Sequence, residues 1–261
     1  IEIEKTCFTN LVAPLQFDGG AIRIVNAQIE VEKCNFTNCK SNSNGGAICV
    51  TFSSPNFEFE LESTIFESCY AGKQGGAVYF LNQVSSCESL IEGCHFKNNH
   101  AVSGAGAFYY SPCANSEMKK NLFINNTCIE PKARGSSLYV YIENREINVF
   151  SKKKIKDDDG TIKPVVIEGN RFRSEPVENT QQLYINLKKS GQLEFNTNAF
   201  SFNKAETIPE NANYVYLSKD EGAVFSVKDD ICVDNQDSHV YGIDSGITID
   251  TDCHTADPEN D

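Results

Sequence analysis

A phenylalanine recurs along the chain at nearly constant intervals, and this internal repeat constrains the fold more than any other feature. The recurring residues are Phe8, Phe36, Phe66, Phe96, Phe123, Phe172 and Phe200, separated by 28, 30, 30, 27, 49 and 28 residues. Extending the spacing predicts two degenerate members, Cys232 and His254, and therefore nine repeat units.

Two apolar segments accompany each phenylalanine. An apolar pair precedes most of them by seven and five residues, as Ile29 and Val31 precede Phe36. The match is weakest before Phe96 and Phe123, where only Ile91 and Met118 fill the second position. A glycine-led segment follows each phenylalanine, and both segments alternate in polarity with the period of half-buried β-strands.

The length of the unit selects among repeat folds. A propeller blade has four strands and about 40 residues, whereas these units have 27–30 residues. They fit one coil of a parallel β-helix with two or three strands, in which equivalent residues stack about 4.8 Å apart.

Two tetrapeptides alternate through the repeat. One is glycine-rich and the other begins with phenylalanine: Gly19-Gly20-Ala21-Ile22, Gly45-Gly46-Ala47-Ile48, Gly75-Gly76-Ala77-Val78, Phe96-Lys97-Asn98-Asn99, Phe123-Ile124-Asn125-Asn126 and Phe200-Ser201-Phe202-Asn203. The alternation resembles the GGA(I/L/V) and FxxN repeats of the polymorphic membrane proteins of chlamydiae and of similar repeat proteins of protists. The resemblance implies a right-handed parallel β-helix at the cell surface with an adhesive role, and it brings no catalytic residues.

We therefore predict an all-β protein, a single-stranded right-handed parallel β-helix (solenoid) of about nine coils over residues 1–250. A loop insertion is expected at about 144–164, where a run of lysines is followed by a run of aspartates. Residues 251–261 are expected to form an acidic tail. The glycines should turn the chain at each coil, and the asparagine three residues after phenylalanine should bond to the backbone and to the next asparagine.

Composition bounds the partners and the setting. The net charge of −13 excludes nucleic acid as a partner, because phosphate binding needs a basic face. No apolar stretch is long enough to cross a membrane. The chain begins within a strand pattern, at Ile1-Glu2-Ile3-Glu4, so we expect it to be part of a longer chain or assembly.

Cysteine usage and glycosylation motifs favour an extracellular or cell-surface location. The eleven cysteines lack zinc spacing, so neither a metal site nor a cofactor is expected. Sequons at Asn35 and Asn125 predict N-glycosylation. Cys39 and Cys69 share a position in successive coils, about 5 Å apart, and are expected to form a disulfide. Cys87 and Cys113, in comparable loops, are the second expected pair.

An acidic ladder is the first candidate interaction surface. Glu4, Glu32, Glu62 and Glu92 stand four residues before their phenylalanines and are expected to face outward. Such a stripe suits Ca²⁺ or a basic partner, but it equally suits solubility and protection of a long β-face.

A tyrosine ladder is the second candidate surface. The third position of the glycine-led strand is occupied in six consecutive coils by tyrosine, namely Tyr79, Tyr109, Tyr139, Tyr184, Tyr216 and Tyr241. The rings either stabilise the sheet alone or form the binding face for a protein or glycan partner, flanked by the insertion.

Three function classes remain open from the sequence. The preferred one is a non-enzymatic surface adhesin or structural rod. The first alternative is a structural component of a larger filament or intracellular assembly, in which free thiols would persist. The second is an enzyme resembling polysaccharide lyases or hydrolases, which is disfavoured because its acidic candidates, from Asp229 to Asp252, lie beside no recurring Lys or Arg.

Overall fold

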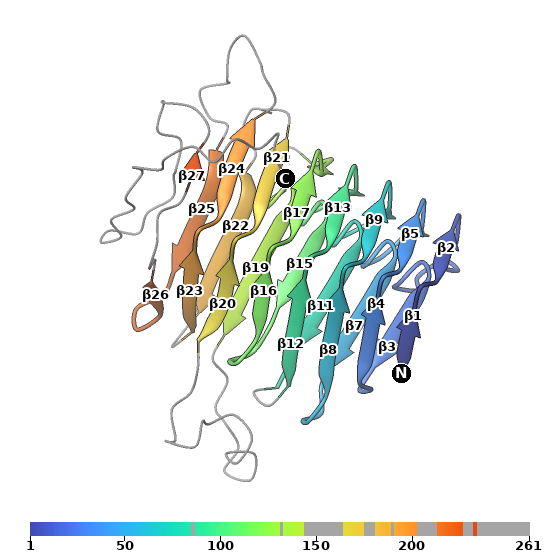
Figure 1. Cartoon of the computed structure of the whole chain (residues 1–261), viewed down its shortest axis with the longest axis horizontal. Coiled ribbons are helices and arrows are strands. Elements are labelled where there is room, and N and C mark those ends of the chain that lie inside the picture. Colours follow the sequence, from blue (N-terminus) through green and yellow to red (C-terminus); the bar gives the residue numbers. More distant parts are fainter. Residues whose placement is uncertain are drawn as a thin grey trace.

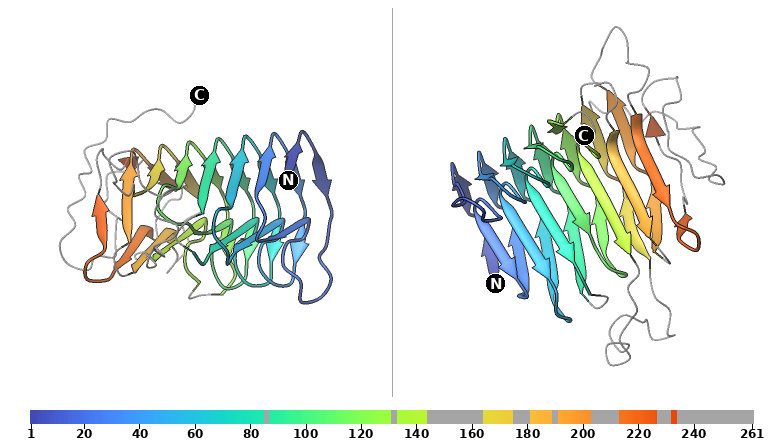
Figure 2. Two further views of the ribbon diagram at one scale, coloured as in Figure 1. Left: turned by 90° about the horizontal axis from the view of Figure 1, so that it is seen from below. Right: turned by 180° about the vertical axis from the view of Figure 1, so that it is seen from behind.

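The computed structural model describes residues 1–84, 87–130, 133–143, 164–174, 181–188, 191–202, 213–226 and 232–233. Within this part of the chain the protein is all-β without a helix, and its strands pair in parallel between successive coils (Figure 1). Figure 2 shows the coils stacked side by side along one axis from the N-terminal end. The prediction of a parallel β-solenoid is confirmed.

The strands form four sheets, and the four coils from β4 to β19 contribute a strand to each of them. We name three of the sheets by the residue type that marks them and the fourth by its short strands. The glutamate sheet contains β1 (Glu2–Glu4), β4 (Ile29–Glu32), β8 (Glu58–Glu62), β12 (Glu88–Glu92), β16 (Glu117–Lys119), β20 (Val165–Glu168), β23 (Gln192–Asn196) and β26 (Val224–Ser226). The phenylalanine sheet contains β2 (Cys7–Thr9), β5 (Asn35–Thr37), β9 (Ile65–Glu67), β13 (His95–Lys97), β17 (Leu122–Ile124), β21 (Arg171–Ser174), β24 (Ala199–Phe202) and β27 (Cys232–Val233).

The two remaining sheets complete the coil. The short sheet contains β6 (Lys40–Ser41), β10 (Tyr70–Ala71), β14 (His100–Ala101) and β18 (Thr127–Cys128). The tyrosine sheet contains β3 (Ile22–Val25), β7 (Ile48–Phe52), β11 (Val78–Asn82), β15 (Phe108–Ser111), β19 (Leu138–Glu143), β22 (Gln181–Lys188) and β25 (Asn213–Lys219).

A residue in the left-handed region separates the first two strands of the coil. Lys33, Ser63 and Lys120 occupy this corner with φ of 53°, 48° and 54°. The sequence predicted two or three strands per coil, and this corner separates the strand of the apolar pair from the strand of the phenylalanine. Glycine occupies the same corner only at Gly93 and Gly169, both with a φ of 63°, so the residue type marks the corner in a minority of the coils.

The recurring phenylalanines form the spine of the interior. They are paired in register from coil to coil, and their rings stack with centroids 4.6–5.1 Å apart from Phe8 to Phe200. Offset stacking of this kind adds to the burial of each ring. The long interval from Phe123 to Phe172 does not disturb the register, because these two residues are also paired.

The repeat loses its predicted register near the end. Phe200 pairs with Val233, and Cys232 pairs with Ala199, so Cys232 does not hold the phenylalanine position. Phe225 is still paired with Leu193. The chain therefore has one residue more between Phe225 and Val233 than between Leu193 and Phe200, and this extra residue lies between β26 and β27. The ninth unit at His254, the acidic tail and the insertion up to residue 163 lie outside the described residues.

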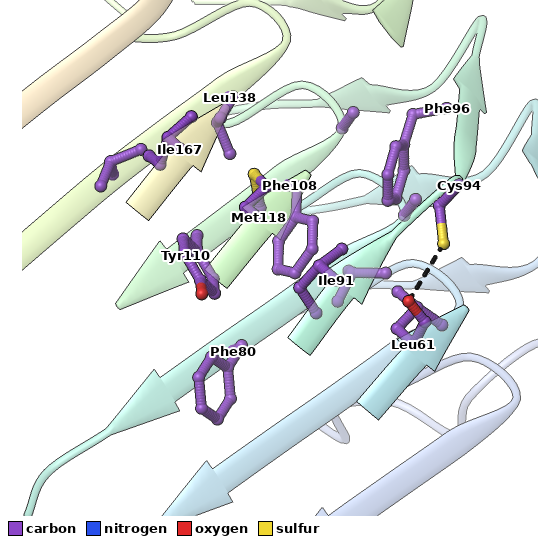
Figure 3. Close-up of a cluster of buried hydrophobic side chains, with 14 of the residues drawn as sticks. Leu61, Phe80, Ile91, Cys94, Phe96, Phe108, Tyr110, Met118, Leu138 and Ile167 are labelled. Atoms are coloured by element: carbon purple, nitrogen blue, oxygen red, sulfur yellow. Dashed lines mark hydrogen bonds between the residues drawn. The ribbon is translucent and has the colours of Figure 1, made fainter. Parts of the chain in front are cut away.

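Polar side chains explain the two weakest repeats. Ser89 and Ser116 stand where the other coils carry the first apolar residue, and Ser89 is paired with Phe59. Its hydroxyl lies 2.9 Å from that of the fully buried Tyr110, and its N–H donates to Ser116 Oγ at 3.2 Å. Figure 3 shows Tyr110 between Phe80 and Met118 in this core. The serines therefore satisfy a phenol inside the rod, and burial raises the pKa of Tyr110.

The paired glycines have two different functions. Gly75 has a φ of 68°, which makes the turn before the tyrosine strand. A Cβ on Gly76 would lie 1.9 Å from the carbonyl oxygen of Gly106 in the next coil. The first glycine therefore provides a backbone conformation, and the second allows two coils to approach closely.

Two buried columns of amides, thiols and one hydroxyl flank the phenylalanines, and we call them the interior ladders. The first lies two residues before each phenylalanine and contains Cys34, Thr64, Cys94, Asn121, Asn170 and Asn198. The second lies three residues after and contains Cys39, Cys69, Asn99 and Asn126. The sequence predicted only the second.

Each ladder asparagine joins adjacent coils. Asn99 Nδ2 donates to the Phe66 carbonyl at 3.0 Å, and Asn99 Oδ1 accepts from the Cys69 N–H at 2.9 Å. Asn99 also donates to Asn126 Oδ1 at 3.0 Å, which confirms the predicted bond between stacked asparagines. A ladder cysteine makes the weaker version of the first bond, from Cys69 Sγ to the Phe36 carbonyl at 3.6 Å.

The predicted disulfides are wrong. The nine cysteines among the described residues are all free, including Cys39, Cys69, Cys87 and Cys113. Stacked residues of a parallel ladder have parallel Cα–Cβ bonds, so their Cβ atoms stay about 4.8 Å apart, beyond the roughly 3.5–4.5 Å of a disulfide. A hydrogen bond between the thiols raises the pKa of Cys69 and lowers that of Cys39. Cys113 Sγ donates to the Cys87 carbonyl instead.

Candidate binding face

The tyrosines of the tyrosine sheet form a continuous stack. Tyr79, Tyr109, Tyr139, Tyr184 and Tyr216 are paired in register, and successive ring centroids are 4.7, 5.2, 4.9 and 5.0 Å apart. Their planes differ by 4–28°. The predicted ladder is thus present in five coils, and Tyr241 lies outside the described residues.

The tyrosines differ in exposure. Tyr79, Tyr109 and Tyr139 are half-buried, and Tyr216 is 36% exposed. Tyr184 is only 4% exposed, which corrects the expectation of an open surface there. Arg134 Nη1 donates to Tyr184 Oη at 2.7 Å, and its guanidinium carbon lies 4.7 Å from the ring centroid. The longest run of adjacent accessible rings is therefore Tyr79, Tyr109 and Tyr139, on the three middle strands of the sheet, and we call these the open or central rungs. Tyr216 is separated from them by the covered Tyr184.

The stacking decides which part of each ring a partner meets. Because the faces of the rings lie against their neighbours, the outer surface presents ring edges and phenol hydroxyls. Burial raises the pKa of Tyr79 to about 12, so that hydroxyl stays neutral and can donate a hydrogen bond at physiological pH. Stacking of a sugar ring on a tyrosine needs a free ring face, so the central rungs favour contacts with edges and hydroxyls.

A second outward row lies beside the tyrosines. Val25, Thr51 and Leu81 are paired in register, and Tyr141 stands two residues after Tyr139. Val25 is 47% exposed, and the other three are half-buried. We call the outer surface of the tyrosine sheet, with both rows, the tyrosine face. Period-two alternation beyond the tyrosine position would have found this row in the sequence.

The tyrosine face is uncharged at its centre. From β7 to β19 the first row contains Cys49 and three tyrosines, and the second row contains only uncharged residues. Charged side chains lie at the borders, where Arg23 is 3.9 Å from Asp18 and Lys188 is 2.9 Å from Asp220. Burial, with the nearby Asp18 carboxylate, raises the pKa of Cys49 to about 12, so this thiol is also neutral.

The glutamate sheet has the opposite character. The predicted acidic ladder is in register from Glu4 through Glu32 and Glu62 to Glu92, and each of these side chains is exposed or half-buried. A second row, Glu2, Glu30 and Glu60, runs beside it. Partial burial and the nearby Glu30 raise the pKa of Glu60, and a hydrogen bond with Glu4 raises that of Glu2.

Lysines neutralise part of this acidic face. Lys5 lies 3.1 Å from Glu4 and Lys120 lies 3.0 Å from Glu92, while Lys33 pairs with Glu32. Among the described residues, no three His, Cys, Asp or Glu side chains gather closely enough to hold a metal ion. The rungs therefore offer separate, partly paired carboxylates, which fits a solvated surface better than a calcium cage.

The sequons lie in different settings. Asn35 is exposed in β5, on the outside of the phenylalanine sheet. Asn125 is half-buried in a turn with a φ of 50°, next to the fully buried Asn126. Only Asn35 presents its amide on an open strand, so glycosylation at Asn125 would need local movement of the turn.

Comparison with known proteins gives no match: no family model, curated protein or solved structure is significantly similar to this chain. The described residues contain no helix of the length and apolarity needed to cross a bilayer.

Proposed function

We propose that the chain is a non-enzymatic β-helical rod, at the cell surface or outside the cell, that holds a protein or glycan partner on its tyrosine face. The alternating GGA(I/L/V) and FxxN motifs support a relation to the polymorphic membrane protein type of repeat.

One observation carries the proposal. The tyrosine face combines three open tyrosine rungs with a second row of uncharged residues, on a chain whose net charge is −13. Tyrosine supplies a large amphipathic contact with little rotamer entropy to lose, and charge-depleted aromatic patches are typical of interface cores. Because ring edges and hydroxyls are presented, a protein partner fits the central rungs better than a stacked sugar does.

Removing the open rings tests this function. The variant Tyr79→Thr/Tyr109→Thr/Tyr139→Thr keeps the strand propensity and removes the rings. We expect at least about a tenfold loss in binding of the labelled chain to cultured cells or to a glycan array, a loss of about 1.4 kcal/mol. The matched control is Ile65→Thr/His95→Thr/Leu122→Thr, which changes the outward column of the phenylalanine sheet in the same coils.

Two results would contradict the proposal. One is equal binding by wild type and the tyrosine variant, with only stability reduced, which would make the ladder purely structural. The other is turnover of acidic polysaccharides by the wild type, which would establish the enzyme alternative.

The free thiols favour a second candidate function, a structural part of an intracellular filament or assembly. Unpaired cysteines persist in reducing compartments and are uncommon in secreted proteins. Nine of the eleven cysteines are described, and all nine are free. Eight of these are buried or half-buried in the rod.

Thiol counting distinguishes the two settings. In the native protein we expect Cys7 alone among the nine to react rapidly with a thiol reagent, because it is exposed. Burial raises the pKa of Cys94, Cys113 and Cys128 to about 12, which removes the reactive thiolate. After denaturation without reductant, at least nine thiols should react. A count of one or three from protein isolated from its source would contradict the intracellular candidate.

A further inference from the structure

The outer faces of the rod differ in the charge that they present to another molecule. The glutamate sheet carries two rows of carboxylates through its first rungs. The phenylalanine sheet carries the Lys97–Glu67 pair, 3.4 Å apart, as well as Arg171 and Arg173. Of these three sheets, only the tyrosine sheet has a run of coils, from β7 to β19, in which both outward rows are uncharged. The short sheet is also uncharged at Tyr70, His100 and Thr127, but its strands have only two residues each.

The tyrosine face also has a fixed period along the rod. Its rungs repeat every 4.7–5.2 Å, which is the spacing of stacked parallel strands. A partner that contacts several rungs in the same way needs side chains with the same repeat along the same axis. A second β-solenoid meets this condition, as in the dry interfaces between stacked sheets of fibrils.

We propose that two copies of this chain pack side by side, tyrosine face to tyrosine face. This inference rests on the proposed function for the identity of the face, and it names a second copy as the occupant. Such a contact between like faces is isologous. Arg134 covers Tyr184, so the contact is centred on the open rungs Tyr79, Tyr109 and Tyr139.

Charge selects this face for contact between copies. Two chains of net charge −13 repel each other, and apposed glutamate sheets would bring like charges together. Apposed tyrosine faces place no charges opposite each other at the centre. Screening the residual repulsion should strengthen the contact, whereas an association driven by opposite charges would weaken in salt.

The size of the face sets the strength of the contact. Seven strands of about five residues cover roughly 30 Å by 15 Å, or on the order of 500 Å² for each partner. A standard stable interface buries about 800 Å² for each partner. The dimer should therefore be weak and reversible, formed at high local concentration.

Sedimentation velocity over protein concentrations of about 10 μM to 1 mM, the range of a weak interface, tests the proposal. The measurement compares about 0.1 M and 1 M NaCl, over which the Debye length falls from about 10 Å to 3 Å. We expect a monomer–dimer equilibrium that tightens with salt. The variant Tyr79→Thr/Tyr109→Thr/Tyr139→Thr should weaken it at least about tenfold, or 1.4 kcal/mol.

A matched pair of single substitutions distinguishes an effect on the tyrosine face from a general effect on folding. Leu81→Glu and Ile65→Glu each add one carboxylate to an outward position of the same coil, in β11 and β9. Leu81→Glu should abolish the dimer, and Ile65→Glu should leave it unchanged. Each variant introduces one charge at a half-buried or exposed position of a strand inside a sheet, and circular dichroism verifies that each is folded.

Three outcomes would overturn the inference: a monomer at every concentration and salt, a dimer that survives Leu81→Glu, or a dimer that both variants weaken equally. If the wild type stays monomeric but loses cell or glycan binding when the three tyrosines are replaced, the second copy is wrong and the proposed function stands. If the dimer forms as expected but binding to cells and glycans is absent, the proposed function is wrong and the dimer through the tyrosine face stands.

Discussion

The variant Gly76→Ala is expected to lose about 3 kcal/mol of stability or more, or to fail to fold, through a single added methyl group. Its Cβ would meet the Gly106 carbonyl oxygen at 1.9 Å and the His100 carbonyl oxygen at 2.6 Å. Both atoms belong to backbone that is fixed by pairing between coils, so no side chain can move aside. Urea unfolding followed by circular dichroism measures the loss.

Gly75→Ala is the control, because it adds the same methyl group one residue earlier. A Cβ on Gly75 would lie 2.3 Å from the Val78 carbonyl oxygen in the same turn. Ala105 occupies the equivalent turn in the next coil with a φ of 53°, so this turn can adjust to a Cβ. We expect a cost of about 1–2 kcal/mol, the ordinary penalty of a left-handed residue with a Cβ. Equal losses for the two variants would show that the turn, rather than the approach of the coils, makes the glycines necessary.

The variant Asn121→Ala is expected to cost about 3 kcal/mol by breaking the first interior ladder. Asn121 Nδ2 donates to the Ile91 carbonyl at 3.0 Å, and its Oδ1 accepts from the Cys94 N–H at 2.9 Å. Both backbone groups are buried, and each unsatisfied one costs about 1–3 kcal/mol. The loss should appear in the free energy of unfolding from urea titration.

Asn121→Cys tests whether the ladder accepts a thiol in place of an amide. Cys94 occupies the position in the preceding coil, where its Sγ donates to the Leu61 carbonyl at 3.3 Å (Figure 3). A cysteine at position 121 should restore the donor to Ile91 and cost about half as much as alanine, because the thiol is a weaker donor. If cysteine and alanine cost the same, the cysteines of the ladder act only as small apolar residues.

The sequence predicts those features that a repeated side chain reports directly. The stack of phenylalanines and the register of the tyrosines follow from spacing alone, because a parallel solenoid places each residue above its equivalent. The same reasoning failed at Cys232, where one extra residue before β27 moved Val233 into register. Sequence spacing predicts register by counting residues, whereas the register in the fold is set by backbone hydrogen bonds between strands. The two disagree wherever the loop between two strands gains a residue.

Other features depend on contacts that no repeat reveals. Tyr184 is buried by Arg134, which lies 50 residues earlier in the chain and in the neighbouring coil. The sequence did not predict the first interior ladder, because Cys34, Thr64 and Asn121 differ in side-chain chemistry. What they share is a hydrogen bond accepted from the backbone N–H at the equivalent position of the preceding coil. The disulfides failed for a geometric reason, since residues that stack do not point at one another.

The stacked architecture determines how the rod would respond to tension. Backbone hydrogen bonds between coils run along the rod axis, as from Lys33 N to the Glu62 carbonyl at 3.0 Å. A force that pulls the two ends apart therefore loads the coils in series, and they should peel off one at a time from an end. Each coil of about 28 residues would release roughly 90 Å of chain in place of a rise of about 5 Å. Under tension the rod would therefore lengthen many times over before its covalent backbone bears the load.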